Sequence, residues 1–271
     1  VVRYPARAPG LDGPARREGG PYPLVVFSQG FAISSEAYAG LLQQWAAAGY
    51  VVADPTYPFT SPGGPGGLDE NDLVHHPADL SAVITALVRA GATPGGPLSG
   101  LVDGRHVGVA GHSDGGDVTD AVTAGTCCRD GRVTAAAVLS GAELARWGGT
   151  YTASGVPLLV TQGNADPINL PACSEQIYNG AAQPKYYLDL LGARHHAPYL
   201  SAGPYDAPPA QAVAYEDVVT KVTVDFWNGY LKGSAPARAA IAGDGTQPGI
   251  STLSGGAPVR VTGSCPGAPR G

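Results

Sequence analysis

The chain of 271 residues contains no methionine, only three lysines and no apolar run of 18 residues. Without such a run, no segment is expected to cross a bilayer, and no charged start followed by an apolar core marks a signal peptide. Because the chain begins at Val1 without an initiator methionine, we expect a processed form. A net charge of −6 without a basic run argues against nucleic acid or an anionic membrane as a partner.

Cysteine is scarce as well, and the chain has four: Cys127, Cys128, Cys173 and Cys265. They form neither a CxxC pair nor a Cys/His ligand spacing, and the neighbouring His75 and His76 lack further ligands, so no metal site is expected. The even number favours an exported, oxidised protein, that is, a secreted or otherwise extracytoplasmic one. Three pairings are open. In one of them, Cys127 and Cys128 bond to each other in a strained vicinal disulfide. In the other two, each of these cysteines bonds to one of the later cysteines, at lower cost.

The apolar residues, 44% of the chain, follow a repeating pattern of strand and helix. Short runs that are apolar throughout predict strands at 24–28, 50–54, 106–110, 133–141, 156–163 and 186–191. Apolar residues at helical spacing predict helices at 34–49, 76–90, 117–125 and 210–231. Such a pattern is typical of an α/β fold with a mostly parallel central sheet and helices on both faces. We expect one monomeric domain over 1–271, with an extended lead-in at 1–22 and an extension at 234–271, formed by a short helix and a surface tail.

One helix start is predicted in more detail. The segment SSEAYAGLLQQWAAAG has two serines before its apolar face, and Ser34 or Ser35 is expected to cap the helix, which Gly49 ends.

The segment HVGVAGHSDGG, residues 106–116, combines a buried strand with a sharp turn, and a helical pattern follows it. Gly-x-Ser-x-Gly in this setting raises Ser113 onto a strained turn, where the small residues Gly111 and Gly115 leave room for it. The alternative is a glycine-rich turn whose serine caps the helix. The segment resembles the nucleophile turn of the α/β-hydrolase fold, which implies a three-layer α/β/α architecture and a serine nucleophile.

A serine nucleophile needs a base within hydrogen-bond reach and an acid that orients the base. Asp166 follows the strand in LLVTQGNADP and is the expected acid, although an Asp-Pro turn is the structural alternative. His195 follows the last strand, in GARHHAP, and is the expected base, with His196 as the reserve. This segment resembles the Gly-Ala-x-His-x-x-Pro stretch that carries the catalytic histidine in cutinase-like and polyester-hydrolase-like enzymes.

The loop after the first strand, Gln29-Gly30-Phe31, is expected to supply an oxyanion donor. VFSQGF resembles the corresponding segment of cutinase-like, platelet-activating-factor-acetylhydrolase-like and chlorophyllase-like hydrolases, in which an aromatic residue follows the glycine. The backbone N–H groups of Phe31 and Asp114 are the two predicted donors. A core position is the alternative for the Phe31 ring.

Aromatic and polar residues near these loops are the expected substrate contacts: Phe31, Tyr57, Phe59 and His196. Ordinary packing of a long loop is the alternative for Tyr57 and Phe59. Asp114 stands where cutinase-like polyester hydrolases often carry a hydrophobic residue. Its carboxylate would disfavour an apolar polymer or an anionic acid beside the nucleophile, unless the side chain points to solvent.

Together these residues predict a serine carboxylic-ester hydrolase that acts through an acyl-enzyme on small acyl esters or on polyesters such as cutin or poly(ethylene terephthalate), without a cofactor. Lipase-like and dienelactone-hydrolase-like activities fit the same residues, as do perhydrolase and acyltransferase activities. A non-catalytic binding protein of this fold would usually lack a triad member. A halide-releasing enzyme would carry aspartate in place of Ser113.

Overall fold

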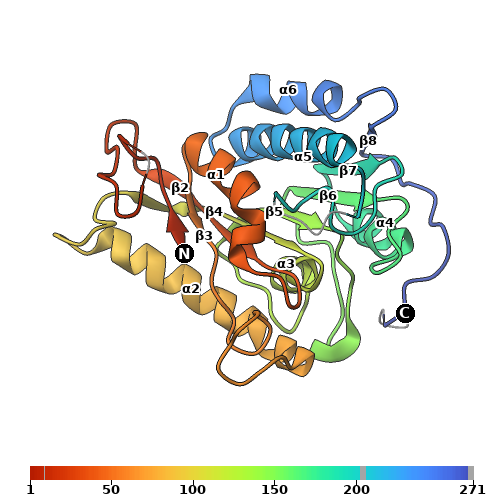
Figure 1. Cartoon of the computed structure of the whole chain (residues 1–271), viewed down its shortest axis with the longest axis horizontal. Helices are drawn as coiled ribbons and strands as arrows, with labels where there is room; N and C mark the ends of the chain where they lie inside the picture. Colours follow the sequence, from red (N-terminus) through yellow and green to blue (C-terminus); the bar gives the residue numbers. More distant parts are fainter. Residues whose placement is uncertain (9, 202–205, 268–271) are drawn as a thin grey trace.

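The computed structural model describes residues 1–8, 10–201 and 206–267, and one eight-stranded sheet runs through its centre (Figure 1). The strand order is β1-β3-β2-β4-β5-β6-β7-β8. The strands are β1 (Val2–Arg3), β2 (Tyr22–Ser28), β3 (Val51–Ala53), β4 (Val102–His112), β5 (Val133–Leu139), β6 (Leu158–Gly163), β7 (Lys185–Leu190) and β8 (Ser251–Gly255). The six central strands are parallel, and the edge strands β1 and β8 are antiparallel to their neighbours.

In the described part of the chain, six α-helices cover the sheet: α1 (Ala39–Ala47), α2 (His76–Ala92), α3 (Asp114–Ala124), α4 (Pro171–Gly180), α5 (Pro209–Tyr230) and α6 (Ala235–Asp244). Residues that alternate along β2 point to opposite faces, as in any strand. Val25 and Phe27 join the core beneath α1, α5 and α6. Leu24 and Val26 join the core beneath α2, α3 and α4. The three-layer α/β arrangement predicted from the sequence is confirmed.

The two edge strands were not predicted. The expected lead-in at 1–22 contains β1, where Val2 pairs with Ala53. The expected surface tail contains β8, where Leu253 pairs with Leu188 of β7. β1 is only two residues long, and β8 has a partner strand on one side only. Neither edge strand therefore has the continuous apolar run from which the central strands were predicted. The predicted short helix is present as α6.

The predicted helix at 34–49 is divided into a 3₁₀ turn (Ser35–Tyr38) and α1. Ser34 occupies the N-cap position of the 3₁₀ turn, as predicted, but neither helix start has a side-chain capping bond. The Ser35 hydroxyl donates to the buried carboxylate of Asp54 instead, which fastens this turn to the end of β3. Gly49 follows the helix with a φ of +96°, a conformation that favours glycine.

The four cysteines form two disulfides, Cys127 with Cys128 and Cys173 with Cys265. The vicinal alternative is therefore the one adopted, against the expectation that two separate bridges to the later cysteines cost less. The second bridge ties the C-terminal tail to α4. No helix among the described residues is long and apolar enough to span a membrane.

Candidate active site

The turn between β4 and α3 holds Ser113 in an unusual backbone conformation, with φ 56° and ψ −125°. Two glycines make the turn possible. A Cβ added at Gly111 would lie 2.1 Å from the Gly115 carbonyl oxygen, and one added at Gly115 would lie 1.9 Å from that of Ser28. The Ser113 side chain makes no capping bond to α3, so the alternative that this serine only caps a helix is not supported. The hydroxyl is left for another role.

Asp166 and His195 lie together, each just beyond the carboxyl end of its strand. His195 Nδ1 is 2.7 Å from Asp166 Oδ2, and both side chains are buried. The other carboxylate oxygen accepts from the backbone N–H groups of Ile168, at 2.8 Å, and Asn169, at 3.2 Å. These bonds fix the carboxylate, and the carboxylate in turn orients the His195 ring. Nε2 is then the ring nitrogen that does not face Asp166.

Ser113 is brought close to this pair through its neighbour His112. The imidazole centroids of His112 and His195 are 4.6 Å apart. Within residues 1–8, 10–201 and 206–267, no hydrogen bond joins the Ser113 hydroxyl to His195. Hydrogen bonds between a nucleophile and its base are often loose before substrate binds.

A buried hydrogen-bond chain connects the loop after β2 with the histidine loop. The N–H of Gly30 donates to the Tyr38 hydroxyl at 3.0 Å, and that hydroxyl lies 2.9 Å from His112 Nδ1. His112 Nε2 lies 2.9 Å from the backbone carbonyl oxygen of His195. Since a carbonyl only accepts, Nε2 carries the proton and Nδ1 accepts from Tyr38. Burial lowers the pKa of His112 well below its usual value, which keeps the ring neutral.

This chain was not predicted. His112 is the variable residue before the serine in the Gly-x-Ser-x-Gly motif, and Tyr38 lies within the helix predicted at 34–49. The one available signal was a polar ring directly before the serine.

The loop at Gly30-Phe31-Ala32 approaches the serine closely. A Cβ added at Gly30 would lie 3.1 Å from the Cβ of Ser113. Ala32 has a φ of +56°, and its N–H donates to the Thr60 carbonyl at 2.8 Å. In the described part of the chain, the N–H groups of Phe31 and Asp114 have no hydrogen-bond acceptor. Neither N–H group is therefore occupied by another residue that the structure describes.

The side chain of Asp114 is not directed freely into solvent. Its Oδ2 is buried and has no hydrogen-bond partner among the described residues. Burial, assisted by the charge of Glu70, raises the pKa of Asp114 to about 6, although Arg146 opposes the shift. A carboxyl group whose charge changes near neutral pH therefore lies directly after the serine.

The candidate substrate contacts differ in exposure. Tyr57 is 2% exposed, stacks on the His76 ring at 3.8 Å and bonds to Ser28 through its hydroxyl, so its side chain packs inside the protein. For Tyr57, these contacts fit the alternative of ordinary loop packing rather than contact with a substrate. Phe59 is 40% exposed, and Phe31 is partly exposed.

His196 is partly buried beside the carboxylate of Asp206, with Nδ1 3.5 Å from Oδ2. The same carboxylate accepts from the N–H groups of His196, at 3.0 Å, and Ala197, at 2.7 Å. Asp206 therefore holds the backbone of the histidine loop, a contact that was not predicted.

The mostly parallel sheet, its covering helices and the strand-turn-helix at Ser113 are consistent with the α/β-hydrolase fold and superfamily. The chlorophyllase family matches residues 13–140, slightly less than half of the chain. The match includes Phe31 and Ser113 and ends before Asp166 and His195. No curated protein matches the chain. The similarity indicates a hydrolase of the esterase type.

Proposed function

We propose that the protein is a serine carboxylic-ester hydrolase with Ser113 as nucleophile, His195 as general base and Asp166 as orienting acid. The observation that carries the proposal is the 2.7 Å pair of Asp166 and His195 beside the strained turn of Ser113. Backbone strain at a polar residue is characteristic of functional sites. The N–H groups of Phe31 and Asp114 are the proposed oxyanion donors.

The chemistry follows from these positions. His195 Nε2 removes the proton of the Ser113 hydroxyl while the oxygen bonds to the ester carbonyl carbon. The developing oxyanion accepts from the two N–H groups, and loss of one such donor typically costs about 3 kcal/mol of barrier. The imidazolium, held by Asp166, then donates its proton to the departing alcohol. Water attacks the acyl-enzyme in the same way and releases the acid, so the reaction requires no cofactor.

The proposed substrates are small acyl esters, with polyesters such as cutin or poly(ethylene terephthalate) and the chlorophyll esters of the matching family as further candidates. Phe31, Phe59 and His196 are the proposed contacts. The partly buried carboxyl group of Asp114 favours esters that are neutral or carry hydrogen-bond donors near the scissile bond. It disfavours substrates with a carboxylate at that position, because like charges repel.

The test is hydrolysis of a series of p-nitrophenyl esters of increasing acyl length by the wild type and Ser113→Ala, with polyester film and chlorophyll assayed in parallel. We expect product from the wild type only, and labelling of Ser113 by a fluorophosphonate. Labelling without hydrolysis of any ester would leave the nucleophile in place and reject the substrate class. Absence of both would reject the proposal.

The two disulfides are compatible with an oxidising, extracytoplasmic compartment. We propose secretion on this basis. Thiol titration of protein purified under non-reducing conditions from its natural source would contradict it if four free thiols were found.

A further inference from the structure

A buried glutamine, Gln162, lies close to the loop at 164–170 that carries Asp166, which we call the acid loop. Gln162 is the last residue but one of β6, and its side chain is fully buried. Leu158 and Val160, which share its face of the strand, belong to the core beneath α2, α3 and α4. An amide in such surroundings is costly to bury unless it is hydrogen-bonded, so its partners are informative.

The amide nitrogen of Gln162 faces three oxygen atoms. Nε2 donates to the carbonyl oxygens of Gly163 and Asn169, each at 3.0 Å, and to Oδ2 of Asp166 at 3.2 Å. Two hydrogens serve three acceptors, so one hydrogen is shared. One side chain therefore contacts the residue before the acid loop, the carboxylate in its middle and a residue near its end.

The orientation of this amide is determined by its neighbours. The buried Ser174 hydroxyl of α4 donates to Gln162 Oε1 at 2.6 Å, with the Gly141 carbonyl oxygen as a longer acceptor at 3.2 Å. Turning the amide over would place Oε1 against three oxygens that only accept. Nε2 therefore faces the acid loop, and α4 holds the other end of the amide.

Asp166 Oδ2 is the oxygen that faces the proposed base. It lies 2.7 Å from His195 Nδ1, and among the described residues Gln162 is its other hydrogen-bond partner. The backbone N–H groups of Ile168 and Asn169 bind Oδ1 only. A carboxylate held through one oxygen can still turn about its Cβ–Cγ bond, because that torsion is soft. Such a turn would carry Oδ2 away from the imidazole.

We propose that Gln162 is a positioning residue for Asp166: its amide fixes the direction of Oδ2 and, through it, the orientation of the His195 ring. The inference rests on the proposed function, because it concerns the same three residues. A displacement of about 1 Å in such a site can cost about 10² in rate. None of the proposed substrate contacts is among the hydrogen-bond partners of Gln162, so its loss affects kcat rather than KM.

The test compares variants of the full chain in the hydrolysis of a p-nitrophenyl ester. Gln162→Met keeps a similar volume and removes both N–H donors. We expect kcat to fall about 10- to 100-fold while KM changes less than about twofold. Ser174→Ala, which releases the other end of the amide, lowers kcat by a smaller factor.

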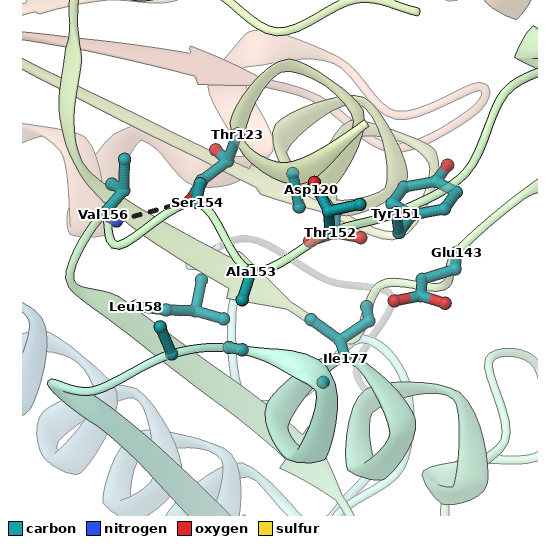
Figure 2. Close-up of a pocket in the computed structure, with 14 residues that line it drawn as sticks. Asp120, Thr123, Glu143, Tyr151, Thr152, Ala153, Ser154, Val156, Leu158 and Ile177 are labelled. Carbon is teal, nitrogen blue, oxygen red and sulfur yellow. Dashed lines mark hydrogen bonds between the residues drawn. The ribbon is translucent and has the colours of Figure 1, made fainter. Parts of the chain in front are cut away.

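Each variant has a matched control. Gln247→Met makes the same change at a half-buried glutamine that donates to two carbonyl oxygens at the end of α6. Ile177→Val alters α4 one turn beyond Ser174, at a side chain that lines the cavity between α3 and α4 (Figure 2). Neither Gln162 nor Ser174 lines that cavity. Both controls should keep the wild-type kcat.

A second readout follows the positioning itself and needs no substrate. The hydrogen bond between His195 Nδ1 and the Asp166 carboxylate is short, and its proton should give a proton NMR signal far downfield. The signal is assigned by its absence in His195→Ala. We expect it to move or broaden in Gln162→Met and to stay unaltered in Gln247→Met.

Circular dichroism checks that each variant folds, and Ser174→Ala carries the test if Gln162→Met does not. A wild-type kcat and an unaltered signal in Gln162→Met would overturn the inference. Equal losses of kcat in Gln162→Met and Gln247→Met would overturn it as well, because they would indicate general loosening. Hydrolysis that survives in Ser113→Ala would reject the proposed function instead, so the two failures are distinguishable.

Discussion

His112 Nε2 donates a hydrogen bond to the backbone carbonyl oxygen of His195 across 2.9 Å. The two residues are 83 positions apart in the chain, yet this bond ties the Ser113 turn directly to the loop that carries the proposed base. Through Tyr38 the same ring is tied to Gly30 in the proposed oxyanion loop. One neutral imidazole therefore links the three loops of the proposed active site.

Replacing Tyr38 with Phe tests this connection. The change leaves His112 Nδ1 and the Gly30 N–H without their buried partner, which costs about 1–3 kcal/mol of folding free energy. We expect kcat for a p-nitrophenyl ester to fall about 10-fold while KM changes little, because the loss displaces groups that act in the transition state.

The matched control is Tyr50→Phe, which removes a hydroxyl that bonds to Asn228 away from the site. It should lower stability without the loss of kcat. If both variants lose stability and neither loses kcat, Tyr38 is structural only.

The adjacent histidines offer a comparison of two neighbouring side chains. We expect His195→Ala to lower kcat by about 10⁶-fold, because its ring is the one that hydrogen-bonds to Asp166. His196→Ala should mainly raise KM, since its ring belongs to the same loop and faces Asp206 instead of Asp166. Initial rates over a range of ester concentrations separate the two effects. The reverse result would assign the base to His196.

The sequence predicted the parts of the fold that local pattern determines. The apolar central strands and the turn at Ser113 depend on residues that are neighbours in the sequence. The order of serine, acid and histidine along the chain led to the prediction that Asp166 and His195 form a pair. The edge strand β8 was missed because its segment, STLSG, has only one partner strand and is mostly polar. The bond between Tyr38 and His112 was missed because 74 residues separate them, and no periodic pattern encodes such a contact.

Asp114 predicts a specific dependence of stability on pH. Its folded-state pKa of about 6 lies above the usual 3.8, so the folded protein holds this proton more tightly than the unfolded chain. The stabilisation is complete below about pH 4 and is lost as the pH rises through 6. Asp114→Asn does not titrate, and so should gain about 1–3 kcal/mol relative to the wild type between pH 4 and 8.

Urea unfolding at several pH values measures this difference, with Asp217→Asn, at an exposed residue of α5, as control. A constant difference between Asp114→Asn and the wild type would show that Asp114 is not the titrating group. The same variant should hydrolyse esters of dicarboxylic acids faster above pH 6, where the wild-type carboxylate is charged.

The two disulfides should contribute unequally to stability, because they close loops of very different length. Cys173 and Cys265 are 92 residues apart, and their bridge fastens a tail that also bonds to Glu175 through Thr262. Replacing both cysteines with alanine should lower the free energy of unfolding by about 2–4 kcal/mol and expose the tail to proteolysis near Thr262. The matched control replaces Cys127 and Cys128, whose bridge restricts almost no chain, and should cost less than about 1 kcal/mol. Equal losses in the two double variants would contradict this account and would assign the stabilisation to local packing rather than to loop closure.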